Sequence, residues 1–435
     1  MKWALYNLLF AAVYPFLLPG FLARMLRRGG YAARMGDRFA LYPDDVRRRL
    51  AAAPHVWIHA VSVGEVQVAG QLMREWRKVD PEVRFCFSTT SSTGWKTAQR
   101  ELGDRDTLVY NPLDFPNFVK SALKTVKPRA LVLTESEIWP NFIRTAHRYG
   151  VPAFLINARV SDRSAPRYRL ARWWFAEVLS CFRCIFAQSA LDRERLTAAG
   201  APEAAVKVSG SFKFDAAVRD PAKEAEMRRW IGSGRMLLGG STWPGEDEAL
   251  IGVYSRLPPE LRAGLKLVIA PRHFEKADAV EANISKAGFT CVRRSRGDAS
   301  AEGAVYLADT TGELMGLYGV ADVVFVGKSL CAHGSQNMIE PCLCGKPVIV
   351  GPYTENFRPV MSDLLEAGGV LQVKDVAELE ARVREFLDPG RARETAALGD
   401  RAREAVERRR GVVAKCAASI AAALQLPSET ARLSR

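Results

Sequence analysis

A chain of 435 residues is too long for one ordinary core and predicts two domains of about 200 residues each. Hydrophobic residues make up 48% of the chain, which is normal for a globular protein, so no large part of it needs to be disordered. The formal net charge of +14 favours an anionic partner: a nucleic acid, an acidic membrane surface or a phosphorylated substrate.

The first predicted element is an apolar helix over Ala4 to Ala23, within an N-terminal anchor at 1–30. About 20 residues without a charge are enough to cross a hydrocarbon core of about 30 Å. The arginines that follow this run place the rest of the chain on the cytoplasmic side. Pro15 and Pro19 weaken the helix, so a monotopic or re-entrant anchor is an alternative to a full span.

Between Ala51 and Ser209, short β-rich runs alternate with helical periodicity, which predicts a parallel sheet covered by helices on both faces. The predicted strands are His55–Val61, Val83–Ser88, Ala130–Leu133, Pro152–Ile156, Cys184–Ala187 and Ala205–Val208. Ligands of such sheets bind at the carboxyl ends of the strands. The loops that follow these strands are therefore the first place to look for a site.

Acids and hydroxyls follow four of these strands. Glu65 opens the helix after the first, and Ser88 to Gly94 is a hydroxyl-rich loop suited to a sugar or a carboxylate. Glu135 and Glu137 follow the third strand, and Asn157 to Arg159 follow the fourth. Several acids at one sheet edge suit general-base chemistry, since one carboxylate raises the pKa of its neighbour. Alternatively, each acid only lies at a helix N-terminus, where the dipole favours it.

The segment from Ser161 to Trp174 interleaves four arginines with Tyr168, Trp173 and Trp174. Such a mixture fits lipid phosphates at a membrane interface, and it also fits single-stranded nucleic acid. Behind an N-terminal anchor the membrane interpretation is preferable, although a solvated helix face is also compatible with the pattern.

The sequence pattern changes over Gly210 to Gly234, and we place the domain boundary near Asp220. The first domain covers residues 31–215, the second covers 216–425, and a tail covers 426–435.

Cys181 and Cys184 form a CxxC without a second pair for zinc, and we expect all eight cysteines to be reduced, core-type thiols in a reducing compartment. The strands predicted for the second domain are Met236–Gly240, Lys266–Ala270, Val305–Leu307, Val323–Val326, Val348–Val350 and Val370–Val373.

One of these strands, at 323–326, leads through the glycine-containing loop Gly327 to Gln336 to Asn337, which can cap a helix starting at Met338. Unpaired N–H groups and a positive dipole end at that point favour a phosphate. Glu340, about one helical turn further on, can reach ribose hydroxyls of the same ligand. An ordinary strand–helix–strand crossover gives the same pattern.

Two other loops of the second half lie at the same predicted edge. Arg272 can neutralise a phosphate, while His273 beside it either binds a ligand or packs. Thr310 to Leu314 offers a glycine turn that enters a helix. Two Rossmann-like halves, with a nucleotide-type site in the second and acids in the first, favour a GT-B glycosyltransferase whose α/β domains face each other across a cleft.

The chain also resembles the 3-deoxy-D-manno-octulosonic acid (Kdo) transferases, glycosyltransferase family 30. The resemblance runs from the anchor to Phe357. Its motifs are RMGDRF at Arg34, SVGEV at Ser62, TESEIWPN at Thr134, NARVSDRS at Asn157, FKFD at Phe212, GSTWPGED at Gly240, APRH at Ala270, TGEL at Thr311 and NMIEP at Asn337.

The resemblance implies an inverting, metal-independent transfer of Kdo from CMP-Kdo to an anionic lipid A precursor of the lipid IVA type, in lipopolysaccharide synthesis at the cytoplasmic face of the inner membrane. CMP-Kdo is the donor substrate, and no further cofactor is implied. Glu65 matches the family's general base, and Glu135 and Lys213 match its transition-state-stabilising positions. The matching CMP-binding residues are Pro271, Arg272, Gly312, Glu313, Leu314, Asn337, Met338, Ile339 and Glu340.

Three departures from the family's pattern lie on the donor side. Trp243 replaces a basic residue, Lys328 replaces a glycine, and Ser335-Gln336 replaces Gly-His. Two other functions are compatible with the sequence: a membrane-associated GT-B enzyme that uses a UDP-sugar, and a catalytically silent nucleotide-sugar-binding protein. Nucleic-acid binding is the least supported function, because no recognition module surrounds the arginine-rich segment.

Overall fold

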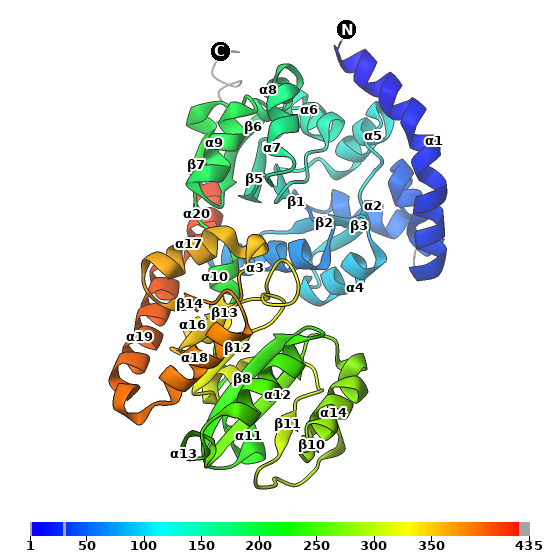
Figure 1. Ribbon diagram of the computed structural model, residues 1–435. Helices are drawn as coiled ribbons and strands as arrows, with labels where there is room; N and C mark the ends of the chain where they lie inside the picture. Colours follow the sequence, from blue (N-terminus) through cyan, green and yellow to red (C-terminus); the bar gives the residue numbers. More distant parts are fainter. Residues whose placement is uncertain (1, 29–31, 426–435) are drawn as a thin grey trace. The chain divides into compact units, whose positions relative to one another are not determined.

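The computed structural model of the chain describes residues 2–28 and 32–425 (Figure 1). The chain forms two compact units: Met1–Phe212 with Gly411–Arg435, and Lys213–Arg410. Each unit contains one seven-stranded sheet with helices on its faces. The predicted pair of parallel α/β domains is thus confirmed, with the boundary at Lys213.

The sheet of the first unit has the order β3-β2-β1-β4-β5-β6-β7, and all its pairings are parallel. Its strands are β1 (Val56–His59), β2 (Phe85–Thr89), β3 (Thr107–Tyr110), β4 (Ala130–Thr134), β5 (Ala153–Ala158), β6 (Phe182–Ala187) and β7 (Val206–Val208). The strand order reverses between β1 and β4, which is where ligands of open α/β sheets bind.

The sheet of the second unit has the order β10-β11-β9-β8-β12-β13-β14, again with all pairings parallel. Its strands are β8 (Arg235–Thr242), β9 (Leu265–Pro271), β10 (Cys291–Arg293), β11 (Val305–Leu307), β12 (Val323–Val326), β13 (Val348–Val350) and β14 (Val370–Gln372). Here the order reverses between β8 and β12. All twelve predicted strands are confirmed, with ends that shift by up to two residues.

Helices connect the strands in both units. The α-helices of the first unit are α1 (Lys2–Arg28), α2 (Asp44–Ala51), α3 (Val63–Val79), α4 (Ser92–Glu101), α5 (Pro116–Val126), α6 (Pro140–Arg148), α7 (Ala165–Leu170), α8 (Arg172–Leu179), α9 (Ala190–Ala198) and α20 (Val412–Gln425). Those of the second unit are α10 (Lys213–Ala216), α11 (Pro221–Ile231), α12 (Glu246–Arg256), α13 (Pro259–Arg262), α14 (Ala277–Lys286), α15 (Leu314–Val320), α16 (Ile339–Leu343), α17 (Arg358–Glu366), α18 (Val376–Leu387) and α19 (Ala392–Arg408).

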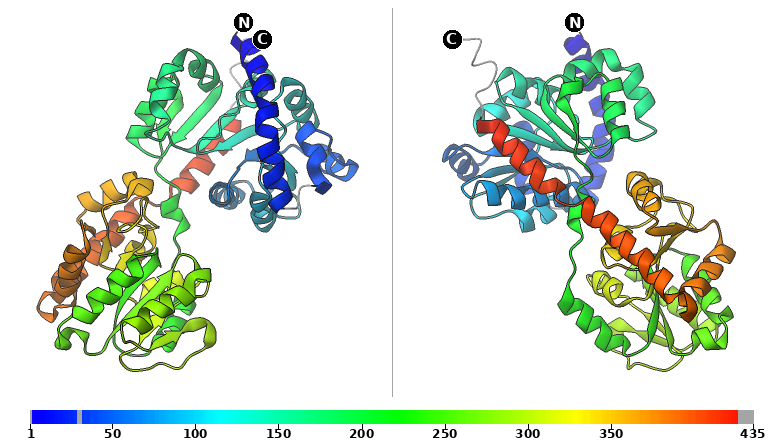
Figure 2. Two further views of the ribbon diagram at one scale, coloured as in Figure 1. Left: turned by 45° about the vertical axis from the view of Figure 1, so that its right-hand side comes forward. Right: turned by 90° about the vertical axis from the view of Figure 1, so that its left-hand side faces the viewer.

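The C-terminal helix α20 belongs to the first unit, although the sequence placed it in the second domain. It packs against α3 (Figure 2). Its residues Val413, Cys416 and Ile420 are buried in the same apolar cluster as Val66 and Leu72 of α3. The second unit is therefore inserted into the first. The predicted tail at 426–435 lies outside the described residues.

Helix α1 packs its first turns against the first unit. Trp3 is buried, with its ring centroid 4.6 Å from that of Trp174. The Tyr6 hydroxyl donates to Asp114 Oδ2 at 3.1 Å. Across residues 2–28 and 32–425, no helix combines the length and the apolar character that a membrane span needs. The predicted spanning anchor is therefore not supported, and the first turns of the apolar run are used for packing.

All eight cysteines of the chain are free, as expected from their spacing. Cys86, Cys184, Cys342 and Cys416 are buried, which agrees with their prediction as packing residues. Cys331 is exposed, in the loop after β12, so the prediction of core-type thiols is wrong at that position.

Candidate active site

Glu65 lies at the point where the strand order of the first sheet reverses. It belongs to the first turn of α3, which follows β1, and its Oε2 accepts a hydrogen bond from the backbone N–H of Val61 at 2.9 Å. Its Oε1 accepts from the Ser62 hydroxyl at 2.8 Å, and the Thr134 hydroxyl of β4 lies 3.3 Å from Oε2. Ser62 in turn caps α3. The carboxylate is half-buried and held by short local bonds, so it is oriented while part of it still faces solvent.

Glu135 follows β4 in an unusual backbone conformation. Its φ is +53°, and its N–H donates to Ile156 O at 2.9 Å. Oε2 pairs with Arg159 Nε at 2.7 Å, and Oε1 accepts from Asn157 Nδ2 at 3.3 Å. Asn157 itself has a φ of +51°. Two neighbouring non-glycine residues in the left-handed region are typical of sites where function outweighs backbone strain.

Glu137, the second acid after β4, is not among the predicted site residues, and the structure gives it unusual acid–base properties. Burial, then the nearby charge of Glu65, raises the pKa of Glu137 from its ordinary value of 4.5 to about 7, against a hydrogen bond from Trp139 that lowers it. Trp139 Nε1 donates to Glu137 Oε2 at 2.9 Å. The expectation that one carboxylate at this edge raises the pKa of another is thus confirmed for this pair. The spacing of acids in TESEIWPN was the signal that could have identified Glu137.

Under these acids lies a buried polar network. The His59 ring is fully enclosed, and burial lowers its pKa to about 3, so it is neutral at physiological pH. Its Nδ1 lies 2.9 Å from Ser88 Oγ, which also accepts from Trp57 Nε1 at 2.8 Å. Ser91 caps α4 and donates to Val61 O at 2.8 Å. The hydroxyls of Ser88 and Ser91, predicted for ligand binding, are thus used inside the protein.

Lys213 begins the second unit, as the first residue of α10. Its Nζ donates to Asn356 O at 3.5 Å and lies 4.1 Å from the ring centroid of Phe357. The three predicted catalytic residues are therefore divided: Glu65 and Glu135 belong to the first unit and Lys213 to the second.

The loop after β12 was predicted to hold a phosphate with its backbone N–H groups, but these groups already bind a carboxylate of the protein. Glu246, at the start of α12, is completely buried. Its Oε1 accepts from the N–H groups of Ser329 and Leu330, each at 2.9 Å. Its Oε2 accepts from those of Lys328 at 2.7 Å and Trp243 at 2.8 Å. The side chain thus fills the anion-binding concavity of this loop.

The predicted helix after this loop begins at Ile339, one residue later than expected, and α16 is only five residues long. Asn337 Oδ1 accepts from Ile339 N at 3.1 Å, and Asn337 Nδ2 donates to Glu340 Oε1 at 3.0 Å. Burial raises the pKa of Glu340, while the positive charge of Arg272 opposes this. The side chains of Met338 and Ile339 are packed in the core.

Pro271 and Arg272 lie at the carboxyl end of β9, next to the end of β8. The Arg272 N–H donates to Thr242 O at 3.0 Å, and its side chain is exposed. The His273 ring packs edge-on against Trp243, with centroids 5.5 Å apart. Pro271, His273 and Trp243 line a cavity of about 150 Å³ at this edge of the sheet.

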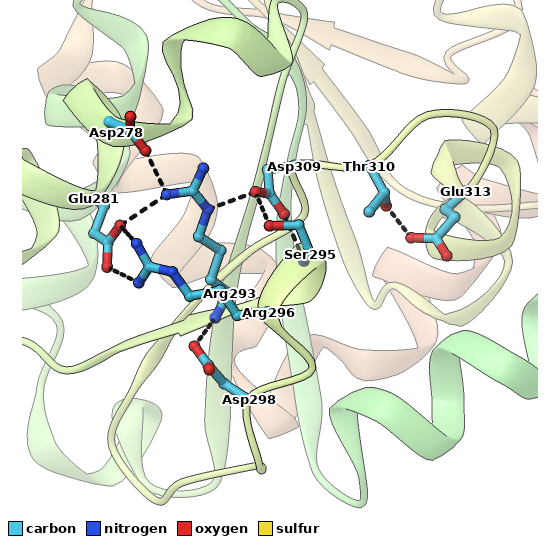
Figure 3. A network of polar contacts seen from close by, with 9 residues as sticks. All are labelled: Asp278, Glu281, Arg293, Ser295, Arg296, Asp298, Asp309, Thr310 and Glu313. Carbon is cyan, nitrogen blue, oxygen red and sulfur yellow. Dashed lines mark hydrogen bonds and ion pairs between the residues drawn. The ribbon is translucent and has the colours of Figure 1, made fainter.

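Gly312, Glu313 and Leu314 follow β11, whose carboxyl end lies beside that of β9. Gly312 has a φ of +84°, which glycine adopts without steric cost. The Glu313 carboxylate accepts from the Thr310 hydroxyl (Figure 3), and Arg294 Nη2 donates to it at 2.8 Å. Glu313 is therefore already paired within the protein.

A network of charged groups lies beside this loop (Figure 3). Arg293 pairs with Asp278 at 2.5 Å, Glu281 at 3.0 Å and Asp309 at 2.5 Å. Asp309 also accepts from the Ser295 hydroxyl at 2.5 Å. Because Asp309 follows β11 and Arg293 ends β10, the network connects the edge strand to the base of the loop and fixes its position.

Comparisons with known proteins show which family the chain resembles. A family model described as 3-deoxy-D-manno-octulosonic-acid transferase (kdotransferase) matches residues 33–216. The 3-deoxy-D-manno-octulosonic acid transferase of Haemophilus influenzae is 33% identical over 396 residues, covering 88% of this chain and 90% of the relative. That of Bordetella pertussis is 35% identical over 367 residues, covering 79% and 83%.

Among solved structures, Anabaena HepE in complex with UDP has a TM-score of 0.57 at 14% identity, and the match covers 86% of this chain and 100% of that one. This likeness concerns the fold, and it agrees with the predicted GT-B class. The chain therefore belongs to the 3-deoxy-D-manno-octulosonic acid (Kdo) transferase family and is a glycosyltransferase.

Proposed function

We propose that the protein transfers Kdo from CMP-Kdo, with inversion at the anomeric carbon, to a hydroxyl of an anionic lipid A precursor of the lipid IVA type. Family membership supports Kdo as the transferred sugar. The observation that carries the mechanism is Glu65, an oriented and partly exposed carboxylate at the strand-order reversal of the first sheet.

In the proposed reaction, Glu65 accepts the proton of the acceptor hydroxyl as its oxygen attacks the anomeric carbon. The new bond forms on the side opposite the bond to the phosphate of CMP, and that bond breaks. The N–H of Val61 and the Ser62 hydroxyl hold the carboxylate in one orientation. Neither of these groups needs to move during the proton transfer.

Negative charge develops on the departing CMP phosphate, and the proposal assigns its neutralisation to cationic side chains of the second unit. Lys213 and Arg272 are the candidates, and no metal ion takes part in the proposed reaction. Glu135, paired with Arg159, is assigned to the positive charge that builds at the anomeric carbon. The remaining proposed CMP-binding contacts come from the backbone around Pro271, Gly312 and Asn337.

The acceptor is a lipid, and we propose that α1 holds the enzyme on the cytoplasmic face of the inner membrane by lying on the bilayer rather than crossing it. An exposed apolar stripe follows the spacing of one helix face: Leu5, Leu8, Leu9, Val13 and Phe16. Leu170 and Trp173 are exposed on the neighbouring segment of α7 and α8. Lys2 Nζ lies 5.5 Å from the Trp173 ring centroid, which connects the two apolar surfaces.

The test is to incubate the purified full-length chain with CMP-Kdo and a tetra-acylated disaccharide bisphosphate, and to weigh the product. We expect a mass increase of one or more Kdo residues, and no transfer from UDP-sugars in a parallel donor panel. Transfer from a UDP-sugar instead would favour the alternative GT-B function. Donor binding without transfer or hydrolysis would favour a silent binding protein.

The base is tested by Glu65→Gln, which keeps the size of the side chain but removes its basicity. We expect transfer to be abolished and CMP affinity to be unchanged. Glu75→Gln is the matched control, because Glu75 lies on the same helix and pairs with Lys78 at 2.6 Å. Retained turnover in the Glu65 variant would exclude Glu65 as the base.

A further inference from the structure

Three cationic or aromatic residues follow the carboxyl ends of adjacent strands in the second sheet. Trp243 follows β8, Arg272 follows β9 and Lys328 follows β12, and β8 pairs directly with both β9 and β12. Two of these three, Trp243 and Lys328, are positions where the chain departs from the family pattern. The structure shows that these two departures are in contact.

The backbone of Lys328 is in a conformation that lysine rarely adopts. Its φ is +56°, in the left-handed region, where glycine has no steric cost. Glu246 accepts the Lys328 N–H at 2.7 Å, and Lys328 O accepts from Ser335 N at 2.7 Å, so the surrounding loop imposes this conformation. A long side chain retained at such a position indicates a role for the side chain itself.

The Lys328 ammonium is oriented but not neutralised. Its Nζ lies 4.7 Å from the ring centroid of Trp243. In the part of the chain that the structure describes, no carboxylate pairs with this ammonium. A cation on an aromatic face is attracted to it but keeps its N–H donors free for another partner. An oxyanion can therefore bind the ammonium without first displacing a carboxylate.

Trp243 contacts side chains from two neighbouring loops. Lys328 Nζ lies 4.7 Å from its ring centroid, and the His273 ring packs edge-on with its centroid 5.5 Å away. The indole Nε1 is buried, and it has no hydrogen-bond partner within residues 2–28 and 32–425. Trp243 also lines the cavity of about 150 Å³, but that cavity is lined by the acids Asp247 and Glu248 and not by Lys328, so the attraction for an anion comes from the ammonium itself.

We propose that Lys328 is a donor-binding residue and that Trp243 positions its ammonium for an oxyanion of CMP-Kdo. The inference rests on the proposed function, which supplies a donor with two such groups, the phosphate and the carboxylate of the sugar. Trp243 stands after β8 in place of a basic residue of the family pattern. Lys328, after β12, supplies a positive charge beside it. Lys328 is a binding residue in this scheme, and Trp243 is a positioning residue that acts through it.

The experiment measures CMP and cytidine affinity by calorimetry, and KM and kcat for CMP-Kdo, in the full-length protein. The variants are Lys328→Gly, Lys328→Arg and Trp243→Leu, with Lys286→Ala at the exposed end of α14 as control. For Lys328→Gly we expect CMP binding to weaken about tenfold, the loss of one charge-assisted hydrogen bond, with cytidine binding unchanged. The arginine variant should retain binding, and Trp243→Leu should raise KM for CMP-Kdo by a smaller factor without a matching loss of kcat.

The result also identifies the group that binds. A weaker affinity for CMP assigns the ammonium to the phosphate, whereas a raised KM for CMP-Kdo with unchanged CMP affinity assigns it to the sugar carboxylate. Both outcomes support the proposal. If wild type binds CMP and transfers Kdo, but Lys328→Gly leaves CMP affinity and KM unchanged, the proposal is overturned while the proposed function stands. If wild type does not bind CMP, both are overturned. Thermal unfolding confirms that the variant is folded.

Discussion

Replacing Glu246 by glutamine tests whether an internal carboxylate organises the donor-side loop. The side chain is completely buried, and each of its oxygens accepts at least two backbone N–H groups. Glutamine keeps the size but replaces one oxygen by an NH₂ group, which is a donor. Whichever way the amide turns, at least two buried N–H groups then face a donor instead of an acceptor.

The expected cost follows from those bonds. A buried donor left without a partner costs about 1–3 kcal/mol, so two of them give about 3 kcal/mol after the loop relaxes. For a domain of about 200 residues, a loss of 1 kcal/mol lowers Tm by about 2–4 °C, which predicts a decrease of about 6–12 °C for the unfolding of the second unit. The neighbouring Glu248→Gln, on the exposed side of α12, should change stability by less than about 0.5 kcal/mol.

The assay combines calorimetric unfolding with amide hydrogen exchange. In Glu246→Gln the amides of residues 328–331 should exchange faster, while those of β8 and β12 keep their protection. CMP affinity should also decrease, because the loop that carries Lys328 loses its fixed position. Unchanged Tm together with unchanged exchange in this loop would show that the carboxylate does not organise it.

Glu137→Gln should remove a change in kcat/KM that wild type shows at about pH 7, because Glu137 gains or loses its proton there and its charge lies near Glu65. The Glu137 carboxyl keeps its proton above pH 4.5 in the folded protein, whereas the unfolded chain loses it there. The free energy of unfolding of the wild type should therefore fall between pH 4.5 and about 7. Urea titrations of the variant should lack this decrease. Lys328→Gly should raise Tm by about 2–4 °C in calorimetry, because glycine removes about 1 kcal/mol of backbone strain. Phe16→Asp should reduce sedimentation with anionic lipid vesicles, while Val218→Asp, at another exposed apolar position but on the second unit, should not. Equal sedimentation of both variants would exclude α1 as the membrane contact.

The strands were predictable from the sequence because a parallel strand buried on both faces is a short apolar run bounded by turn residues. The two strands that were missed, β3 (Thr107–Tyr110) and β10 (Cys291–Arg293), are edge strands of their sheets. The edge position alone is not the reason, because the edge strands β7 and β14 were predicted; β3 begins with Thr107, and β10 has a single valine between Cys291 and Arg293. Their short sequences therefore lack the continuous apolar character on which the prediction depends.

The donor-side loop shows why the site was predicted only in part. Small residues after β12 correctly indicated N–H groups that converge on an anion. The sequence could not show that the anion is Glu246, because it precedes Lys328 by 82 residues and no local pattern connects them. Lys328 and Trp243 were recognised as unusual, but their contact exists only after β8 and β12 pair.

The insertion of the second unit into the first has a consequence for synthesis on the ribosome. Residues 213–410 are complete, and able to collapse into their own sheet, before the helix that covers part of the first unit has been made. Until α20 emerges, the part of α3 that packs against it stays exposed. The unit whose synthesis begins first is thus the last to complete its fold. During that interval its exposed apolar surface is available to chaperones and to neighbouring nascent chains.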